Sequence, residues 1–157
     1  MAAPVQDAAS SSPNAKTQNA ESIALRLIAR AEQCSAGLFR KLEMRGCNPA
    51  SIEEVISRLT EQGLINDERY ARLWLQTRVR LTRTPKRLLA GLVSKGIPRN
   101  EAQTALDAVL DEDTEMAMLN RFVKKHAKKP PQQLKYLLKS EGFSKQNIHI
   151  STEINTQ

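Results

Sequence analysis

Aromatic residues are scarce in this chain of 157 residues, where three Phe, two Tyr and one Trp make up 4% of the sequence. β-Sandwiches and barrels depend on aromatic and β-branched residues, so this scarcity argues against both. No apolar run reaches the length of about eighteen residues that a membrane span needs, so we expect no membrane-spanning segment. The beginning of the chain lacks the apolar core of a secretory signal. The two cysteines, Cys34 and Cys47, have no CxxC spacing, and we interpret them as reduced thiols.

Motifs for catalysis and metal binding are also missing. The sequence contains no Walker A loop, HExxH, GxSxG or paired CxxC motif. We interpret the two histidines, His126 and His149, as surface residues. The acidic residues at 111–115 suit the start of a helix capped by Asp113 or Thr114 better than they suit a metal site. We therefore expect no enzymatic activity, no cofactor and no metal; a nuclease in particular would need an acidic metal constellation.

Helix-forming residues and positive charge are what the chain does have. Leu, Ala, Glu, Lys and Arg dominate, which favours helices. Lys and Arg number 24 against 17 Asp and Glu, for a net charge of +7. Acidic residues are absent between Glu68 and Glu101 and again between Glu115 and Glu141, although Lys and Arg continue through both stretches. Exposed helices often interleave the two signs, so these stretches indicate a surface for phosphates or an acidic protein.

The candidate residues for binding a partner or DNA come from these two stretches. They are Arg69, Arg72, Arg78, Arg80, Arg83, Lys86, Arg87, Lys124, Lys125, Lys128 and Lys129. One face of the helix that holds the first arginines is expected to consist of Tyr70, Leu73, Trp74, Thr77 and Leu81. We expect four of the arginines to lie broadly on the opposite side: Arg69, Arg72, Arg80 and Arg83. The lysine pairs 124/128 and 125/129 have the i,i+4 spacing of one helix side. Contact with phosphate and simple solvation both remain open for each side chain.

Three segments of the chain repeat one pattern. Residues 35–47, 85–97 and 131–143 each begin with Ser or Pro, place two leucines four residues apart, and end on Gly followed by an apolar residue. Such leucines share one helix face, Ser or Pro suits a helix start, and Gly suits the left-handed conformation that ends a helix. Ser35 is the expected cap of the first of these helices. The glycines are 50 and 46 residues apart, a period typical of stacked helical units.

Each repeat is expected to hold three helices. In the first repeat they cover residues 21–33 and 36–45, and a third begins with Asn48 as cap and Pro49. Because a unit of about 45 residues buries little surface alone, stacked units should form an elongated, curved all-α array. The expected organisation is a disordered leader at 1–18 and three-helix repeats at 19–65, 66–110 and 111–157, the last with a short or frayed final helix that Ser144 can cap.

Several of these segments resemble the RecX family of regulatory proteins. They are Leu38-Phe-Arg-Lys-Leu42, Gly63-Leu-Ile-Asn-Asp67-Glu-Arg69-Tyr70-Ala71, Arg78-Val-Arg80, Pro85-Lys-Arg-Leu88 and Lys95-Gly96-Ile97. The resemblance covers about residues 20–150. It implies three tandem three-helix repeats, a place in the bacterial cytoplasm, and no metal or small cofactor. It also implies binding to the RecA recombinase and inhibition of RecA filament growth, strand exchange and ATP hydrolysis; some members bind DNA.

Two hypotheses follow for the function. The first is a monomeric regulator that binds the RecA–DNA filament through its basic surface and blocks filament extension, within recombination, DNA repair and the SOS response. The alternative is a helix-turn-helix-like module that acts directly on single- or double-stranded DNA. Asn100 and Gln103 are the only near match for side chains that read bases from a recognition helix.

Overall fold

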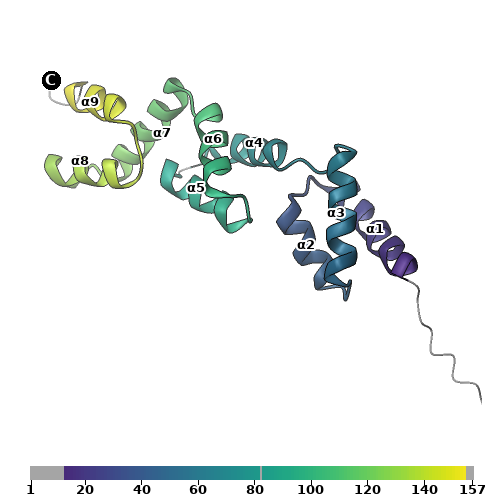
Figure 1. The fold of residues 1–157 in the computed structure, drawn as a ribbon. Helices are drawn as coiled ribbons and strands as arrows, with labels where there is room; N and C mark the ends of the chain where they lie inside the picture. Colours follow the sequence, from purple (N-terminus) through teal and green to yellow (C-terminus); the bar gives the residue numbers. More distant parts are fainter. Residues whose placement is uncertain (1–12, 82, 155–157) are drawn as a thin grey trace, which may run out of the picture. The chain divides into compact units, whose positions relative to one another are not determined.

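The computed structural model of the chain describes residues 13–81 and 83–154, and these residues form nine helices and no strand (Figure 1). The helices are α1 (Pro13–Arg30), α2 (Ser35–Glu43), α3 (Pro49–Glu61), α4 (Asp67–Arg78), α5 (Pro85–Ser94), α6 (Arg99–Val109), α7 (Glu112–Lys125), α8 (Pro131–Ser140) and α9 (Lys145–Ile154). The predicted all-α class and the grouping of helices in threes are confirmed. The described residues divide into two compact units, one ending at Asn66 and the other beginning at Asp67.

The first helix begins earlier than predicted. The expected leader, residues 1–18, falls mostly on residues 1–12, which lie outside the described part of the chain. Residues 13–18, however, form the start of α1, which also ends at Arg30 instead of residue 33. The prediction looked for large apolar residues, whereas Thr17, Ala20 and Ala24 are the buried residues in this part of α1. Small side chains allow a close approach of α1 to α3. The start of α1 is therefore stabilised by packing that no pattern of large apolar residues in the sequence indicates.

The first unit has one core between its three helices. α1 packs on α3 and α2, and α2 packs on α3. The fully buried residues are Ala20, Ala24, Leu38, Leu42, Ile52, Val55, Leu59 and Ile65. Leu38 and Leu42 are the paired leucines of the repeat, which confirms that their helix face is buried.

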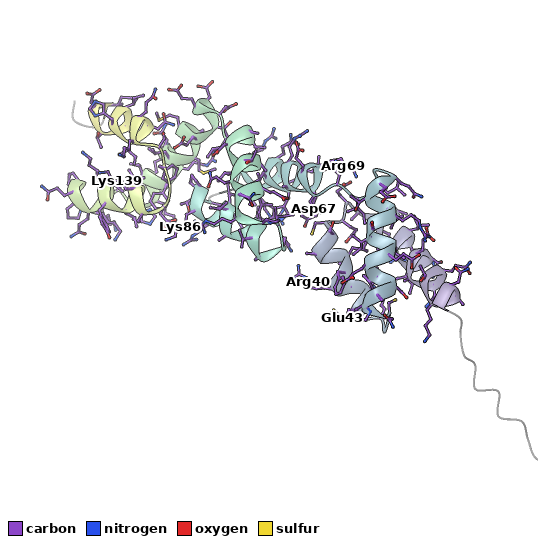
Figure 2. All side chains as sticks on the ribbon, in the orientation of Figure 1. Arg40, Glu43, Asp67, Arg69, Lys86 and Lys139 are labelled. Atoms are coloured by element: carbon purple, nitrogen blue, oxygen red, sulfur yellow. The ribbon has the colours of Figure 1, made fainter. Side chains whose placement is uncertain are left out.

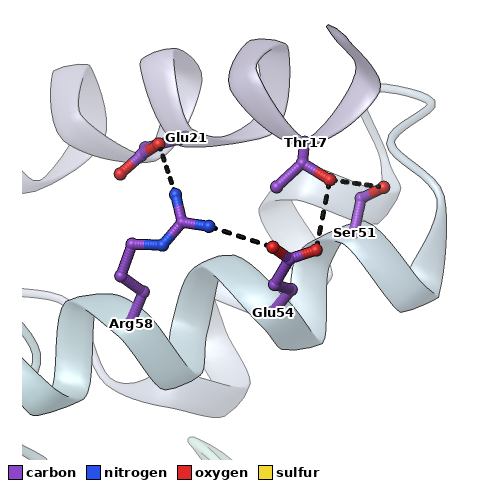
Figure 3. Close-up of polar contacts among 5 residues, drawn as sticks. All are labelled: Thr17, Glu21, Ser51, Glu54 and Arg58. Atoms are coloured by element: carbon purple, nitrogen blue, oxygen red, sulfur yellow. Dashed lines mark hydrogen bonds and ion pairs between the residues drawn. The ribbon is translucent and has the colours of Figure 1, made fainter. Parts of the chain in front are cut away.

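Polar contacts also join α1 to α3 (Figure 3). One guanidinium nitrogen of Arg58 lies 3.0 Å from Glu21, and another lies 2.9 Å from Glu54. The hydroxyl of Thr17 is 3.4 Å from both Ser51 and Glu54. Figure 3 shows Arg58 bridging the two carboxylates, one from each helix.

Helix ends in the first unit follow the predicted chemistry, with one exception. The Asn48 side chain accepts a hydrogen bond of 2.8 Å from the amide of Ala50, as expected of a cap. Gly46 has φ +81°, the left-handed conformation predicted for the end of α2. Ser35 does not cap α2 but is its first residue, and Cys34 stands at the cap position without a side-chain capping bond. The Cys34 side chain is buried, so packing decided this position.

The second unit contains α4 to α9. α4 and α5 pack on α6, while α7 and α8 pack on α9. Leu88 and Leu92 of the repeat pattern are fully buried, and so is Leu138 in α8. Ala102, Ala105 and Leu106 form the buried side of α6.

Hydrogen bonds between described residues join the two helix groups of the second unit. The backbone amide of Lys86 donates to the carbonyl of Glu141 at 3.0 Å, and the Thr84 hydroxyl donates to the Glu141 carboxylate at 2.5 Å. Arg121 of α7 donates to the carbonyl of Val79 at 2.8 Å. The backbones at Gly142 and Lys86 come close together: a Cβ built on Gly142 would lie 3.3 Å from the Lys86 amide nitrogen.

Side chains cap both α7 and α9. The cap of α7 is Asp111, whose carboxylate accepts from the Thr114 amide at 2.8 Å, so the predicted caps Asp113 and Thr114 are wrong. The hydrogen bonds from the side chain and backbone of Thr114 lower the pKa of Asp111 below its ordinary value. α9 does begin after Ser144, whose hydroxyl accepts from the Asn147 amide at 3.3 Å, as predicted.

Candidate functional site

The buried face of α4 differs from the predicted one. Leu73, Thr77 and Leu81 are exposed, while Ala71, Trp74, Leu75 and Val79 form the buried side. The prediction followed the largest side chains, but Trp74 packs against the backbone of Gly91 in α5, which rotates the helix towards its small residue, Ala71. Only the central residue of the predicted face, Trp74, is buried.

The rotation of α4 separates the predicted arginines in this helix and just after it. Arg72 and Arg80 are exposed, whereas Arg69 and Arg78 are half-buried. Arg72 pairs with Glu68 one turn earlier at 2.8 Å. The Arg78 guanidinium lies over the Trp74 indole, 4.3 Å from the ring centroid, which is a cation–π contact. Arg78 therefore belongs to the packing of α4 as much as to its surface.

Two of the predicted arginines line a cleft in the second unit. This cleft, the arginine cleft, has a volume of about 750 Å³. Its lining comes from α4, α6 and α7 and from the residues that follow α4: Arg72, Gln76, Val79, Arg80, Ala108, Val109, Asp113, Thr114, Ala117 and Arg121. Three guanidinium groups and one carboxylate, that of Asp113, thus face one open space, which suits an anionic partner.

Arg121 is the cleft residue that sequence reasoning did not select. Its guanidinium donates to the Val79 carbonyl, and its Nε is buried without a hydrogen-bond partner. Arg121 lies in the second stretch without acidic residues, and this position could have identified it. The prediction instead selected the lysines that follow it. The structure brings Arg121 to Arg72 and Arg80 only because α7 packs beside the end of α4.

Three other predicted residues meet in a smaller pocket of about 150 Å³, here called the Arg87 pocket. Arg83 precedes α5, Arg87 lies in its first turn, and Lys125 is the last residue of α7. The full lining is Arg83, Thr84, Arg87, Met118, Phe122, Lys125, His126, Leu137 and Glu141. His126, predicted to lie on the surface, is half-buried: its ring stacks on Phe122 with centroids 4.1 Å apart.

The lysines are less regular than predicted. α7 ends at Lys125, so Lys128 and Lys129 lie in the following turn and the two i,i+4 pairs do not form along a helix. A helix cannot continue regularly into Pro130, because proline has no amide hydrogen for the carbonyl of residue 126 and disfavours a helical conformation of the residue before it. Lys86, labelled in Figure 2 at the beginning of α5, is exposed and lines neither cavity. Lys124 and Lys128 are also exposed and line neither cavity.

The described residues contain no cluster of three His, Cys, Asp or Glu side chains that could hold a metal ion. The acidic run at the start of α7 serves as the cap and first turn of that helix. His149 is exposed and lies 3.1 Å from Glu153. Within residues 13–81 and 83–154, no helix has the length and apolar character to cross a membrane.

Comparison with known proteins matches two consecutive parts of the chain to one family. Residues 20–59 match the family described as RecX, first three-helix domain, and residues 66–106 match RecX, second three-helix domain. The first match spans α1 to α3, and the second spans α4 to α6. Together they take up more than half of the chain.

Individual relatives and a solved structure agree with these matches. The chain is 30% identical over 141 residues to the regulatory protein RecX of Treponema pallidum, covering 88% of this chain and 86% of the relative. It is 25% identical over 135 residues to that of Caldanaerobacter subterraneus, covering 85% and 68%. The crystal structure of RecX from Lactobacillus salivarius superposes with a TM-score of 0.73 at 22% identity, over 90% of this chain and 98% of that one. The chain belongs to the RecX family of regulatory proteins.

Proposed function

We propose that this chain regulates the RecA recombinase by binding the RecA–DNA filament and blocking its extension. It would act as a monomer in the bacterial cytoplasm, in recombination, DNA repair and the SOS response. Its three-helix repeats at 19–65, 66–110 and 111–157 are the proposed binding modules. No bond is made or broken in this mechanism, so no catalytic group or cofactor is needed.

Uncompensated positive charge in the second unit is the observation that carries the proposal. Among the described residues no carboxylate forms an ion pair with Arg80, Arg83 or Arg87. Lys124, Lys125, Lys128 and Lys129 likewise have no ion pair. Cations that do not stabilise their own fold through ion pairs remain available to an anionic partner, whose field they complement at long range.

The mechanism is a shift of equilibrium. A protein that binds the filament surface more tightly than an incoming RecA subunit does takes the place of that subunit. The equilibrium then shifts towards the shorter filament. Contacts made by several modules of one chain reinforce one another, because each bound module raises the local concentration of the next. Inhibition at low ratios of this protein to RecA is therefore expected.

The test is ATP hydrolysis by RecA on single-stranded DNA, with this protein added well below the RecA concentration. The expected result is a falling rate together with shorter filaments in electron micrographs. Unchanged hydrolysis with unchanged filament length would refute the proposal.

Direct action on DNA is the competing function, and the Arg87 pocket and arginine cleft are the features that favour it. Binding that depends mainly on DNA phosphates weakens steeply as salt rises, because counterions are released from the DNA. Equal affinity for DNA alone and for RecA filaments on the same DNA, with one salt slope for both, would favour this function over filament regulation.

A further inference from the structure

We propose that the Arg87 pocket is a binding site for a phosphate group. The proposal concerns this chain by itself and does not require RecA. It goes beyond regulation of the filament because it assigns a ligand class to one defined cavity.

The pocket has cationic walls and a covered floor. Arg83, Arg87 and Lys125 are exposed at its rim, while Thr84 and Met118 are buried beneath them. These residues come from the segment before α5, from α5 itself and from α7, so the fold brings them together. The volume of about 150 Å³ is several times the space of about 30 Å³ that one water molecule occupies in the liquid, which leaves room for a phosphate group.

The charges in the pocket do not cancel. None of the three cations lies within 4.0 Å of a carboxylate oxygen in the described part of the chain. Glu141 is the only acidic residue in the lining, and its Oε2 atom already accepts the hydrogen bond of 2.5 Å from the Thr84 hydroxyl. Three cations and one carboxylate leave an excess of positive charge, which favours an anion of more than one negative charge.

The ligand would be held by side chains and not by the beginning of α5. Residue 85 is proline and has no amide hydrogen, the Lys86 amide donates to the Glu141 carbonyl, and the Arg87 amide donates to the Thr84 hydroxyl oxygen. With these backbone donors occupied, the guanidinium and ammonium groups are the available donors. Two arginines and a lysine offer the forked and single donors that phosphate oxygens accept in proteins.

Glu141 gives the proposal a distinctive test. Its carboxylate shares the pocket with the cations, so its negative charge opposes a bound phosphate. Glu141→Gln removes that charge but keeps an oxygen that can accept from Thr84. The variant should therefore bind phosphate more tightly, whereas loss of a cation should weaken binding. A residue that served only the fold would weaken binding when replaced.

The experiment is a nuclear magnetic resonance titration of the full chain at constant ionic strength, first with inorganic phosphate and then with a short oligothymidylate. Lys125→Gln should weaken binding about tenfold, the usual effect of losing a charged hydrogen bond. Lys139→Gln is the matched control, since Lys139 is also an exposed lysine of the second unit but lies outside the pocket lining and outside the candidate binding residues. Glu141→Gln should tighten binding about threefold or more. Unfolding midpoints establish that each variant is folded, and if Glu141→Gln is not, the lysine pair decides.

The two probes identify the source of the phosphate. Inorganic phosphate that binds with this order of variants identifies a free phosphate group, and binding of the oligonucleotide alone identifies a phosphodiester. Equal effects of Lys139→Gln and Lys125→Gln, or no binding of either probe, would overturn the proposal. RecA hydrolysis assays of the same variants separate the two proposals: a pocket variant that still inhibits RecA leaves filament regulation intact, whereas phosphate binding by a protein that never inhibits RecA refutes only the regulation.

Discussion

The rim of the Trp74 indole occupies the space where a side chain at position 91 would begin. A Cβ built on Gly91 would overlap Cη2 of Trp74 and lie 3.0 Å from Cζ2. Gly91 stands inside α5, where glycine costs about 0.5–1 kcal/mol relative to alanine. The helix therefore accepts a poor helix former because α4 and α5 meet through this aromatic ring.

Gly91→Ala is expected to destabilise the second unit. Alanine favours the helix, but the overlap with the ring forces Trp74 or α5 to shift, and overpacking of this kind costs about 1–3 kcal/mol. We expect a net loss of about 1–2 kcal/mol in the free energy of unfolding, measured by urea denaturation. A more stable variant would show that the ring moves without cost.

Making Gly91→Ala in a Trp74→Leu variant tests whether the overlap with the Trp74 ring causes this loss of stability. With the indole gone, the same Gly91→Ala change loses its steric cost and keeps its helical gain of up to about 1 kcal/mol. The double-mutant cycle should therefore show a coupling of about 1 kcal/mol or more between the two positions. Additive effects would mean that the two side chains act independently.

Thr84→Val should loosen the junction between α5 and α8. The Thr84 hydroxyl accepts from the Arg87 amide at 3.4 Å and donates to Glu141, and the residue is 2% exposed. Loss of a cap and a buried hydrogen bond predicts a decrease of about 1–3 kcal/mol in unfolding free energy. Thr104→Val in α6 is the control, because that hydroxyl is exposed and its loss should change stability by no more than about 0.5 kcal/mol.

Asp111→Ala should destabilise the protein near neutral pH but not in acid. The hydrogen bonds from Thr114 place the folded-state pKa of Asp111 below its unfolded value. A lowered folded pKa means that the stabilisation is present above the unfolded value of about 3.9 and disappears as pH falls through the folded pKa. Urea midpoints should therefore separate wild type from variant at pH 7, and this difference should shrink as pH falls below the unfolded value. Asp113→Ala, which removes an exposed first-turn acid without a capping bond, should show a smaller difference at neutral pH.

Local patterns in the sequence predicted the repeat well because each of its features depends on a few neighbouring residues. Leu38, Leu88 and Leu138 are buried as the i,i+4 pattern required. Gly46 and Gly142 have positive φ because the helix before each must end in a left-handed residue. Asn48 caps α3 through its own side chain. Such features are set within one turn of helix, so the sequence carries them directly.

Features that depend on distant packing were not predictable in this way. The start of α1 depends on contacts between Thr17 and α3, and the buried side of α4 depends on the space that Gly91 leaves for Trp74. The same applies to the site. The charge pattern identified Arg80 and Arg87, but their separation into two cavities and the addition of Arg121 follow from the packing of α7 beside α4 and α5. No periodicity within one helix encodes those distances.

Replacing Arg72 and Arg80 together by Gln should remove most of the inhibition of RecA. Both side chains are exposed and line the arginine cleft, and the surface pair of Arg72 with Glu68 contributes no more than about 0.5 kcal/mol, so the fold should survive. Half-inhibition of RecA ATP hydrolysis on single-stranded DNA should need at least about tenfold more of the variant than of the wild type. The reason is that each charged contact to a partner is worth about 1.5–3 kcal/mol. Arg26→Gln with Arg30→Gln in α1 makes the same change of net charge on exposed residues of the first unit and should leave inhibition near the wild-type level. If both double variants lost inhibition equally, net charge alone would be responsible and the cleft would have no special part in binding.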